Sequence, residues 1–284
     1  MATLLATDIP VDTCSPAEHL RQIAVAVRVS FTWWGVHRCL TNEQKEEASA
    51  TYAADARFLT AGKKIIDVKH EAYRELTSLR SKIVSYWRSL TLPYVEAGVR
   101  LIRQAEVRAF VNQMERSQGQ LIQAEANLNA AFAQVKTDAR RRLGRLYNPQ
   151  DYPAEIRGLF GVEWDFPATE PPNYLLRISP EIYAQEQERV TRRFEQAVEL
   201  AEQAFVTEFS RLVSHLTERL GSGEEGERKI FRDTVVTNLG EFFERFRNLS
   251  VRSNTQLDQL VDQAKNLVQG IEPQALRDNN ALRQ

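Results

Sequence analysis

Hydrophobic and polar positions alternate along residues 23–33, whose sequence is IAVAVRVSFTW. Every odd position holds a branched or aromatic apolar residue, whereas the even positions hold Ala, Ala, Arg, Ser and Thr. Alternation with a period of two is typical of a β-strand with one buried face, and Val, Phe and Trp are common in strands. The pattern therefore predicts a strand over 23–33.

Helical periodicity begins soon after this strand. Thr41 and Gln44 have the spacing of a capping box, and apolar residues then recur at intervals of three, four or seven as far as Leu90. There is no proline from 41 to 92. The pattern predicts one long helix, in which Gly62 is the weak point because glycine is a poor helix former.

A second long helix is expected over residues 100–146. Its apolar positions repeat every seven residues, at Met114, Leu121, Leu128 and Val135, and such a stripe is typical of a helix that packs along another helix. Only the short segment 91–100 separates the two predicted helices. We therefore expect an antiparallel helical hairpin that packs like a coiled coil.

Residues 147–179 are rich in Pro, Gly and aromatic residues, and two short segments, 161–166 and 174–178, have the composition of strands. A lone strand leaves its backbone groups unpaired, and about three strands are needed for a stable small sheet. We therefore expect 23–33 to pair with 161–166 and 174–178. The expected fold is mainly α, a helical hairpin with a small antiparallel sheet.

The C-terminal third predicts more helix. Ser179 and Pro180 suit a helix start, and an apolar stripe follows as far as Leu220. The segment 221–228, GSGEEGER, has the composition of a flexible linker. The expected organisation is an N-terminal segment (1–22), the hairpin with the sheet (23–220), the linker (221–228) and a C-terminal helical segment (229–284).

Composition and the cysteine positions bear on where in the cell the protein works. Of the 284 residues, 43% are hydrophobic and 26% are charged, which is ordinary for a globular protein. There is no apolar run of about 18 residues, as a membrane-spanning helix needs, and the N-terminus lacks the basic region of a signal peptide. Cys14 and Cys39 match no metal-ligand spacing. We expect a reduced protein in the cytoplasm.

Charge is unevenly distributed, although the net charge is only −1. Residues 57–145 contain 17 Lys and Arg against 8 Asp and Glu. Such a segment indicates either a polyanionic partner or internal charge pairing. As candidate contacts to nucleic-acid phosphates we take the cations of the hairpin: Lys63, Lys64, Arg80, Lys82, Arg88, Arg100, Arg103, Arg108, Arg140, Arg141, Arg142 and Arg145.

Four aromatic residues are candidates for stacking on unpaired bases or for contact with a partner: Trp34, Tyr86, Trp87 and Tyr94. For Trp34, packing against a helix on the second face of the sheet is the favoured alternative. For the basic segment as a whole, pairing with the acidic C-terminal helices is favoured over nucleic-acid binding. Both alternatives stay open at the level of sequence.

Catalytic signatures are missing from the sequence, which contains no GxxxxGK[ST], GxGxxG, GxSxG or HExxH motif and no paired CxxC. The four histidines are scattered without ligand spacing. Glu71 and Glu75 are more typical of a solvated helix face than of a metal site. We expect no metal, no cofactor and no enzymatic activity.

Three segments carry a resemblance: Gly35-Val-His-Arg38, Thr60-Ala-Gly-Lys-Lys-Ile-Ile-Asp67 and the stretch from Arg140 to Pro153, RRRLGRLYNPQDYP. In this order they resemble domain of unknown function 3150, a family from phages, plasmids and other mobile elements, over roughly residues 20–240. The resemblance brings no catalytic residues. Trp33-Trp34 and the residues after 250 depart from the family pattern.

Genes of this family tend to lie near genes for ring-forming AAA ATPases, von Willebrand-type adaptors or phage recombination proteins, which implies a protein partner. The resulting hypothesis is a non-enzymatic interaction or scaffold protein of a phage or other mobile element, acting through self-association or partner proteins. The alternative is a sequence-non-specific DNA-binding protein that uses the basic hairpin 57–145 in recombination or end protection.

Overall fold

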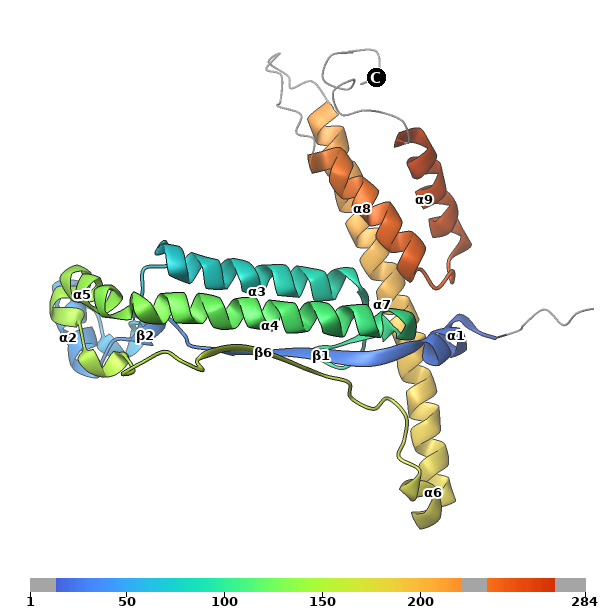
Figure 1. Ribbon diagram of the computed structural model, residues 1–284, viewed down its shortest axis with the longest axis horizontal. Helices are drawn as coiled ribbons and strands as arrows, with labels where there is room; N and C mark the ends of the chain where they lie inside the picture. The colour runs from blue at the N-terminus through green and yellow to red at the C-terminus, as the bar shows by residue number, and fades with distance from the viewer. Residues whose placement is uncertain (1–13, 221–233, 269–284) are drawn as a thin grey trace, which may run out of the picture. The chain divides into compact units, whose positions relative to one another are not determined.

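A computed structural model describes residues 14–220 and 234–268 (Figure 1). The chain divides into two compact units. Unit 1 comprises the described residues of Met1–Arg28, Ser89–Glu106 and Phe166–Gln284, and unit 2 comprises Val29–Arg88 and Val107–Asp165. One four-stranded antiparallel sheet has the strand order β4-β5-β1-β6, and its strand β1 (Ala24–Trp33) contributes residues to both units.

Unit 1 begins with α1 (Pro16–Ile23), which opens with a capping box between Ser15 and Glu18. The strands β4 (Thr91–Pro93) and β5 (Val99–Arg103) form a hairpin, and β5 also pairs with β1 in the register Ala24↔Arg103. After the 3-10 turn Gln104–Glu106, unit 1 continues with the C-terminal helices, which are α6 (Tyr174–Ile178), α7 (Pro180–Leu220), α8 (Thr234–Leu249) and α9 (Thr255–Val268).

The core of unit 1 forms where α1 and α8 pack against α7, the 41-residue helix, and α9 packs against α8. Aromatic side chains fill much of it. The rings of Phe205 and Phe246 lie 5.0 Å apart, and those of Phe205 and Phe242 lie 6.2 Å apart, both edge to face. Burial of such large apolar side chains is the main stabilising contribution in a bundle of this size.

Unit 2 contains two longer helices, α3 (Glu71–Ser89) and α4 (Val107–Ala130), together with α5 (Phe132–Leu143) and the strand β6 (Phe160–Asp165). The small elements are α2 (Asn42–Thr51), β2 (His37–Cys39), β3 (Gly62–Lys64) and the 3-10 turns Ala56–Phe58, Gly144–Leu146 and Pro149–Asp151. Its core includes fully buried side chains of α4, namely Phe110, Met114, Leu121 and Leu128.

The predicted strands have different outcomes. The strands at 23–33 and 161–166 are confirmed as β1 and β6. The strand at 174–178 is wrong, because these residues form the helical turn α6, which packs on α7. Periodicity does not separate a five-residue apolar strand from a helical turn. The missing sheet partners are β4, in the segment that was expected to be a loop, and β5, most of which was expected to begin the second helix.

The single helix expected from 41 to 92 is also wrong. The capping box of Thr41 and Gln44 is present, but α2 ends after ten residues, where Ala53 takes φ +50° and the Ala54 N–H donates to the Ser49 carbonyl at 3.1 Å. This bond pattern closes a helix. Gly62 is not a weak point in a helix: it lies in β3, which pairs with β2 in the register Cys39↔Gly62.

The second predicted helix is largely confirmed. It begins at Val107, because residues 99–103 form β5, and it is divided at Ala131 into α4 and α5. The four heptad residues from Met114 to Val135 are all buried, as expected. The Tyr86 ring stacks on Phe110 at 6.2 Å, and Asn127 donates to Glu75 at 3.3 Å. α3 and α4 thus run in opposite directions, but a long coiled-coil hairpin is not confirmed.

The C-terminal expectations hold where the structure describes the chain. Ser179 caps α7 by accepting the Ile182 N–H at 3.3 Å, and the apolar stripe of this helix contributes Phe194, Ala201 and Phe205 to the core. The predicted linker 221–228 lies outside the described residues, and the predicted domain limits stay a prediction. Within 14–220 and 234–268, no helix combines the length and hydropathy needed to cross a bilayer.

Candidate interaction surfaces

Lys63 is not on a basic surface, contrary to the sequence-based interpretation. Its side chain is buried in unit 2, where Nζ lies 2.8 Å from an Asp151 carboxylate oxygen and donates to the Leu146 carbonyl at 2.6 Å. A buried lysine with two partners is not available to a phosphate. If its ammonium group left them, the buried Asp151 carboxylate would lose its compensating cation.

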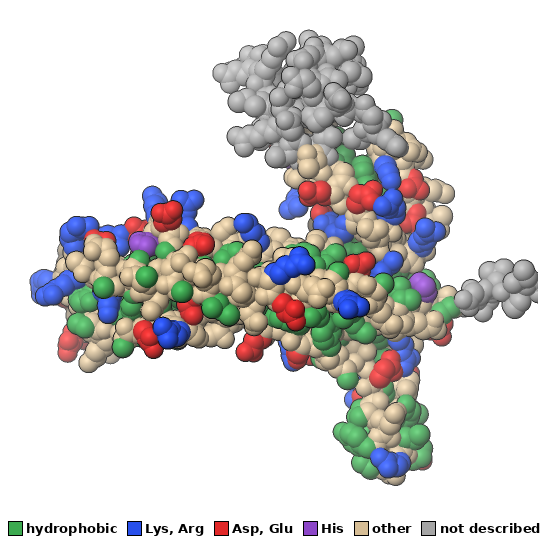
Figure 2. All heavy atoms as spheres, viewed as in Figure 1, with side chains coloured by type: hydrophobic (Ala, Val, Ile, Leu, Met, Phe, Trp, Pro, Cys, Tyr) green, Lys and Arg blue, Asp and Glu red, His purple; other side chains and the backbone are tan. Residues whose placement is uncertain are grey.

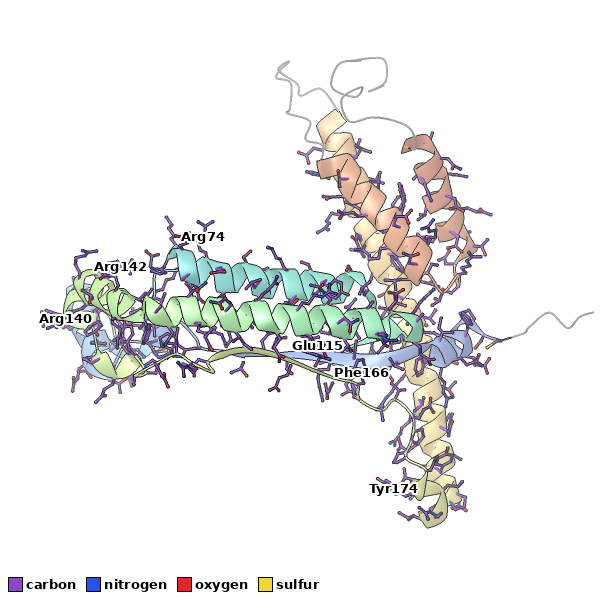
Figure 3. All side chains as sticks on the ribbon, in the orientation of Figure 1. Arg74, Glu115, Arg140, Arg142, Phe166 and Tyr174 are labelled. Atoms are coloured by element: carbon purple, nitrogen blue, oxygen red, sulfur yellow. The ribbon has the colours of Figure 1, made fainter. Side chains whose placement is uncertain are left out.

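The arginines at the end of α5 are exposed but mostly paired with carboxylates of unit 2. Arg141 binds Asp138 at 2.8 Å, Arg142 binds Asp67 at 2.6 Å, and Arg145 binds Glu47 at 3.0 Å. Exposed pairs of this kind contribute little to stability. Arg140 is also exposed, and Figure 3 places it at the end of unit 2 formed by α5.

Asp67 connects this arginine cluster to the loop before α3. The pKa of its carboxyl group is lowered, first because the backbone N–H of Lys69 donates to it at 2.9 Å and also because Arg142 lies beside it. The carboxylate is therefore charged at neutral pH and neutralises part of the basic cluster. The carboxylates of all these ion pairs lie within unit 2, so the arginines pair with acidic residues of their own unit.

Arg100 and Arg103 belong to β5, in unit 1, and thus lie in a different unit from the other candidate cations. Arg100 donates to the Thr91 hydroxyl at 2.7 Å and to the Thr91 carbonyl at 2.8 Å, whereas Arg103 donates to the Ser250 carbonyl at 3.4 Å. Both side chains are half-buried and hold unit 1 together. A single basic hairpin over 57–145 does not describe them.

The remaining candidates are exposed residues of unit 2: Lys64, Arg80, Lys82, Arg88 and Arg108. Arg80 lies over two rings of β1, 4.8 Å from the Trp33 centroid and 5.1 Å from the Phe31 centroid. Figure 2 shows Lys and Arg side chains gathered near the end of unit 2 that carries α5. The cations of this unit are therefore accessible in part, with acidic residues between them.

The four candidate stacking residues all have packing partners. Trp34 lies edge-on to Phe132 of α5 at 6.0 Å, Tyr86 stacks on Phe110, and Trp87 is buried. Tyr94 is buried in unit 1 beside Phe194, and burial raises the pKa of its hydroxyl group. The structure thus places Trp34 against a helix, the favoured alternative, and none of the four is among the exposed large apolar residues.

Sequence reasoning missed two aromatic side chains that are open to solvent. Tyr52 and Phe58 flank the turn after α2, and Phe58 is 88% exposed. The loop between α2 and β3 was interpreted as the interior of a helix, and Tyr52 was counted as part of its apolar stripe. Asp55, which accepts the Arg57 N–H at 2.9 Å, was the available signal for a turn.

A cluster of exposed apolar side chains lies around the start of α7 in unit 1. Tyr174, Leu176, Ile178 and Ile182 are all exposed, and Ile178 is 70% exposed. Figure 2 shows apolar side chains gathered at the end of unit 1 that carries α6, and Figure 3 labels Tyr174 there. This cluster, the α6 patch, exceeds the scattered apolar residues of an ordinary surface.

A second apolar surface is an open groove of about 460 Å³ between α7 and α9. It is lined by Val206, Phe209, Ser210, Val213 and Ser214 of α7 and by Asn254, Gln256, Leu257 and Leu260 at α9. None of these residues is charged. Val206 is 45% exposed and Leu260 is 55% exposed. The groove, here the α7–α9 groove, therefore presents apolar side chains that neither helix buries.

Among the described residues, no three His, Cys, Asp or Glu side chains are grouped so that they could hold a metal ion. Comparison of the chain with protein-family models, with curated proteins and with solved structures finds no match. The resemblance to domain of unknown function 3150 therefore stays a prediction, and the function has to be inferred from the surfaces themselves.

Proposed function

We propose that this chain is a non-enzymatic interaction or scaffold protein of a phage or other mobile element, which works in the cytoplasm by packing its helices against other proteins or against further copies of itself. One observation carries the proposal: unit 1 leaves two apolar surfaces exposed, the α6 patch and the α7–α9 groove. Large apolar patches on a protein surface mark sites of association, because water is released when they are covered.

Burial of the apolar side chains in the α6 patch and the α7–α9 groove favours association over a solvated surface. Covering a fully exposed Ile or Leu side chain contributes about 1.5–3 kcal/mol. The four side chains of the α6 patch are 46–70% exposed, so covering them contributes part of that value for each residue, which offsets the entropy that association costs. Charged residues are depleted at the centres of protein interfaces, and the lining of the α7–α9 groove has none.

Light scattering of the full chain over a range of micromolar concentrations tests the proposal. We expect a mass above the 32.5 kDa of a single chain, or a shift to a higher mass when a ring-forming ATPase or adaptor encoded beside it is added. Ile178→Asp should weaken any association that uses the α6 patch. A strictly monomeric protein that also leaves these added proteins unbound would contradict the proposal.

A second candidate function is sequence-non-specific DNA binding by unit 2, and exposed aromatic and basic side chains favour it. Phe58 and Tyr52 offer open rings, and Lys64 and Arg140 are exposed cations of the same unit. Phosphate contacts give affinity that falls steeply with salt, and rings stack on unpaired bases. The ion pairs of the α5 arginines weaken this candidate relative to the first.

Fluorescence anisotropy with single- and double-stranded DNA at about 50 and 200 mM salt tests DNA binding. If unit 2 binds phosphates, affinity should fall by orders of magnitude across that range, and replacing Arg140, Arg141 and Arg142 by Glu should abolish it. Unchanged binding by this triple variant would exclude the α5 arginines as the site. Absence of binding at the lower salt would exclude this second candidate.

A further inference from the structure

The side of α3 that faces away from the core of unit 2 carries cations and serines. Leu76, Ile83 and Trp87 are buried and mark the core side of this helix. At about 100° per residue, the opposite side is formed by a set of exposed residues: Arg74, Ser78, Ser81, Lys82, Ser85 and Arg88. We call these residues the α3 face, and Figure 3 labels Arg74 near the start of the helix.

The α3 face is free of carboxylates beyond the first turns of the helix. The acidic residues of α3 lie in its first two turns, at Glu71 and Glu75, and the next acidic residue along the chain is Glu96. Within the described part of the chain, no carboxylate forms an ion pair with Lys82 or Arg88. The charge of these two cations is therefore not neutralised by a contact within the chain.

Several other exposed cations do pair with nearby carboxylates. Arg141 at the end of α5 binds Asp138 at 2.8 Å, and Arg189 of α7 binds Glu186 at 2.5 Å. Such pairs are typical of a solvated helix face, on which the two signs of charge alternate. The α3 face carries one sign of charge only, which is typical of a surface that binds a polyanion.

The serines of the α3 face place hydroxyl groups between the cations. The Ser81 hydroxyl donates to the Thr77 carbonyl at 3.0 Å, whereas the hydroxyls of Ser78 and Ser85 make no hydrogen bond with the described residues. Lys, Arg and Ser side chains are the common donors to phosphate oxygens of DNA. The face extends over 14 residues, which is about 21 Å and matches about six phosphates of one strand.

The composition of the α3 face fits a phosphate backbone better than it fits a protein. The centres of protein interfaces are rich in aromatic residues and poor in Lys and Ser, and none of the exposed large apolar side chains of the described residues lies on α3. Stacking on unpaired bases needs an open ring, but Tyr86 stacks on Phe110 and Trp87 is buried. Contact through phosphates alone favours duplex DNA, which has the higher charge density.

We propose that the α3 face binds the phosphate backbone of duplex DNA without reading its sequence. Arg74, Lys82 and Arg88 neutralise phosphates, and the serine hydroxyls between them donate to phosphate oxygens. The inference rests on the second candidate function, DNA binding by unit 2, and names the form of DNA that is bound. It places the contact on α3 rather than on the arginines at the end of α5, so the two sites can be tested separately.

Removal of two cations from the α3 face tests the site. Binding of the full-length chain to a fluorescent duplex, measured by anisotropy between about 50 and 200 mM salt, gives a slope of log K against log[salt] that counts phosphate contacts. Lys82→Gln with Arg88→Gln should reduce the slope by about 1.8 and the affinity about tenfold for each lost contact. The matched control is Arg192→Gln with Arg211→Gln, which removes two exposed cations of α7 in unit 1 and should leave the slope unchanged.

Ser85→Glu provides a second test, because it adds a carboxylate to the middle of the α3 face without removing a cation. We expect duplex binding to weaken about tenfold at the lower salt. The matched control is Ser214→Glu, since Ser214 is an exposed serine of α7 in unit 1, and this variant should bind like the parent chain. Circular dichroism of both variants checks that they are folded.

Poly-glutamate serves as a competitor that distinguishes an acidic polypeptide from DNA. It should displace the labelled duplex only at a concentration of charge well above that of unlabelled duplex, because it lacks the charge density of DNA. Equal displacement at equal concentrations of charge would mean that the α3 face binds acidic proteins, and would overturn the inference.

The remaining outcomes separate this inference from the proposed function. If duplex binding persists in the α3 variants and is lost only when the α5 arginines are replaced, the inference is wrong while DNA binding by unit 2 stands. Tighter binding to single strands that is lost in Phe58→Ala would place the site at the exposed rings and also overturn the inference. If the parent chain binds no DNA at the lower salt, the second candidate function and the inference both fail, whereas association through helix packing is unaffected.

Discussion

The Nζ of Lys63 lies 2.8 Å from a carboxylate oxygen of Asp151, and both side chains are largely buried within unit 2. The same Nζ donates to the Leu146 carbonyl at 2.6 Å. β3, which carries Lys63, is thereby joined to the 3-10 turns that follow α5. A residue that looks like part of a basic surface in the sequence is instead a structural connection.

Removing the Lys63 charge should destabilise the fold. Lys63→Met keeps the apolar part of the side chain but leaves Asp151 as a buried carboxylate without its cation, which should cost about 3–5 kcal/mol of unfolding free energy. Urea unfolding followed by circular dichroism measures the loss. Lys64→Met is the matched control, because the neighbouring Lys64 is exposed, and a loss of similar size in both variants would contradict the structural role.

Gly62→Ala should destabilise the β2–β3 pair. A Cβ at position 62 would lie 2.4 Å from Cε1 of His37 and 3.1 Å from the Arg38 carbonyl oxygen, and such crowding costs about 1–3 kcal/mol. His37→Ala in the same chain should recover part of the loss, since it removes the closer contact. Gly35→Ala, whose Cβ would meet only Arg38 at 3.9 Å, should be tolerated in thermal unfolding, and equal losses at 35 and 62 would refute the crowding argument.

Glu125 is buried on α4 and should be essential for the start of β6. One of its carboxylate oxygens accepts the Leu159 N–H at 2.9 Å and the Phe160 N–H at 3.0 Å. Glu125→Ala removes this acceptor from the Phe160 N–H and leaves the Leu159 N–H only its bond to the Ile156 carbonyl at 3.1 Å, at a cost of about 1–3 kcal/mol. Hydrogen exchange should accelerate at these two amides before the rest of the strand. Glu115, exposed on the same helix (Figure 3), is the control for substitution by Ala.

Tyr152 should make the stability of unit 2 sensitive to high pH. Its hydroxyl donates to the Ile65 carbonyl at 2.9 Å, and burial raises its pKa to about 12. Because the folded-state pKa lies above the unfolded value, the neutral hydroxyl stabilises the fold fully below about pH 10 and loses that effect as the pH rises towards 12.

The measurement is urea unfolding of the parent chain and Tyr152→Phe between pH 8 and pH 12. The variant should be less stable by about 1 kcal/mol at the lower end, and the difference should shrink as the pH rises. Tyr52→Phe is the control, since Tyr52 is exposed. A difference that stays constant through this range would mean that Tyr152 does not ionise with the raised pKa.

Regular patterns predicted several elements correctly. The alternation over 23–33, the heptads of Met114 and Leu121, and the serine that caps α7 all reappear in the structure, because each depends on residues close together in the sequence. Predictions failed where a local pattern fits two structures. Apolar spacing continued across the turn at Ala53, and the short run 174–178 fits a helical turn as well as a strand.

For the candidate basic site too, the sequence identified the residues but not their contacts. The sequence identified the cations of 57–145, but not that Lys63 is buried against Asp151, which follows it by 88 positions, or that Arg100 belongs to another unit. Charge pairing over such separations depends on which strands and helices meet.

The periodicity of side chains along one element is visible in the sequence, and it was enough to predict the helical character of the chain, the two strands with clear composition and the position of the buried stripes. Which surfaces stay open depends on how those elements pack together. Whether Val213 or Ile178 is covered depends on how many helices pack around α7. Local sequence does not specify that number. In unit 1, Val213 and Ile178 both stay exposed.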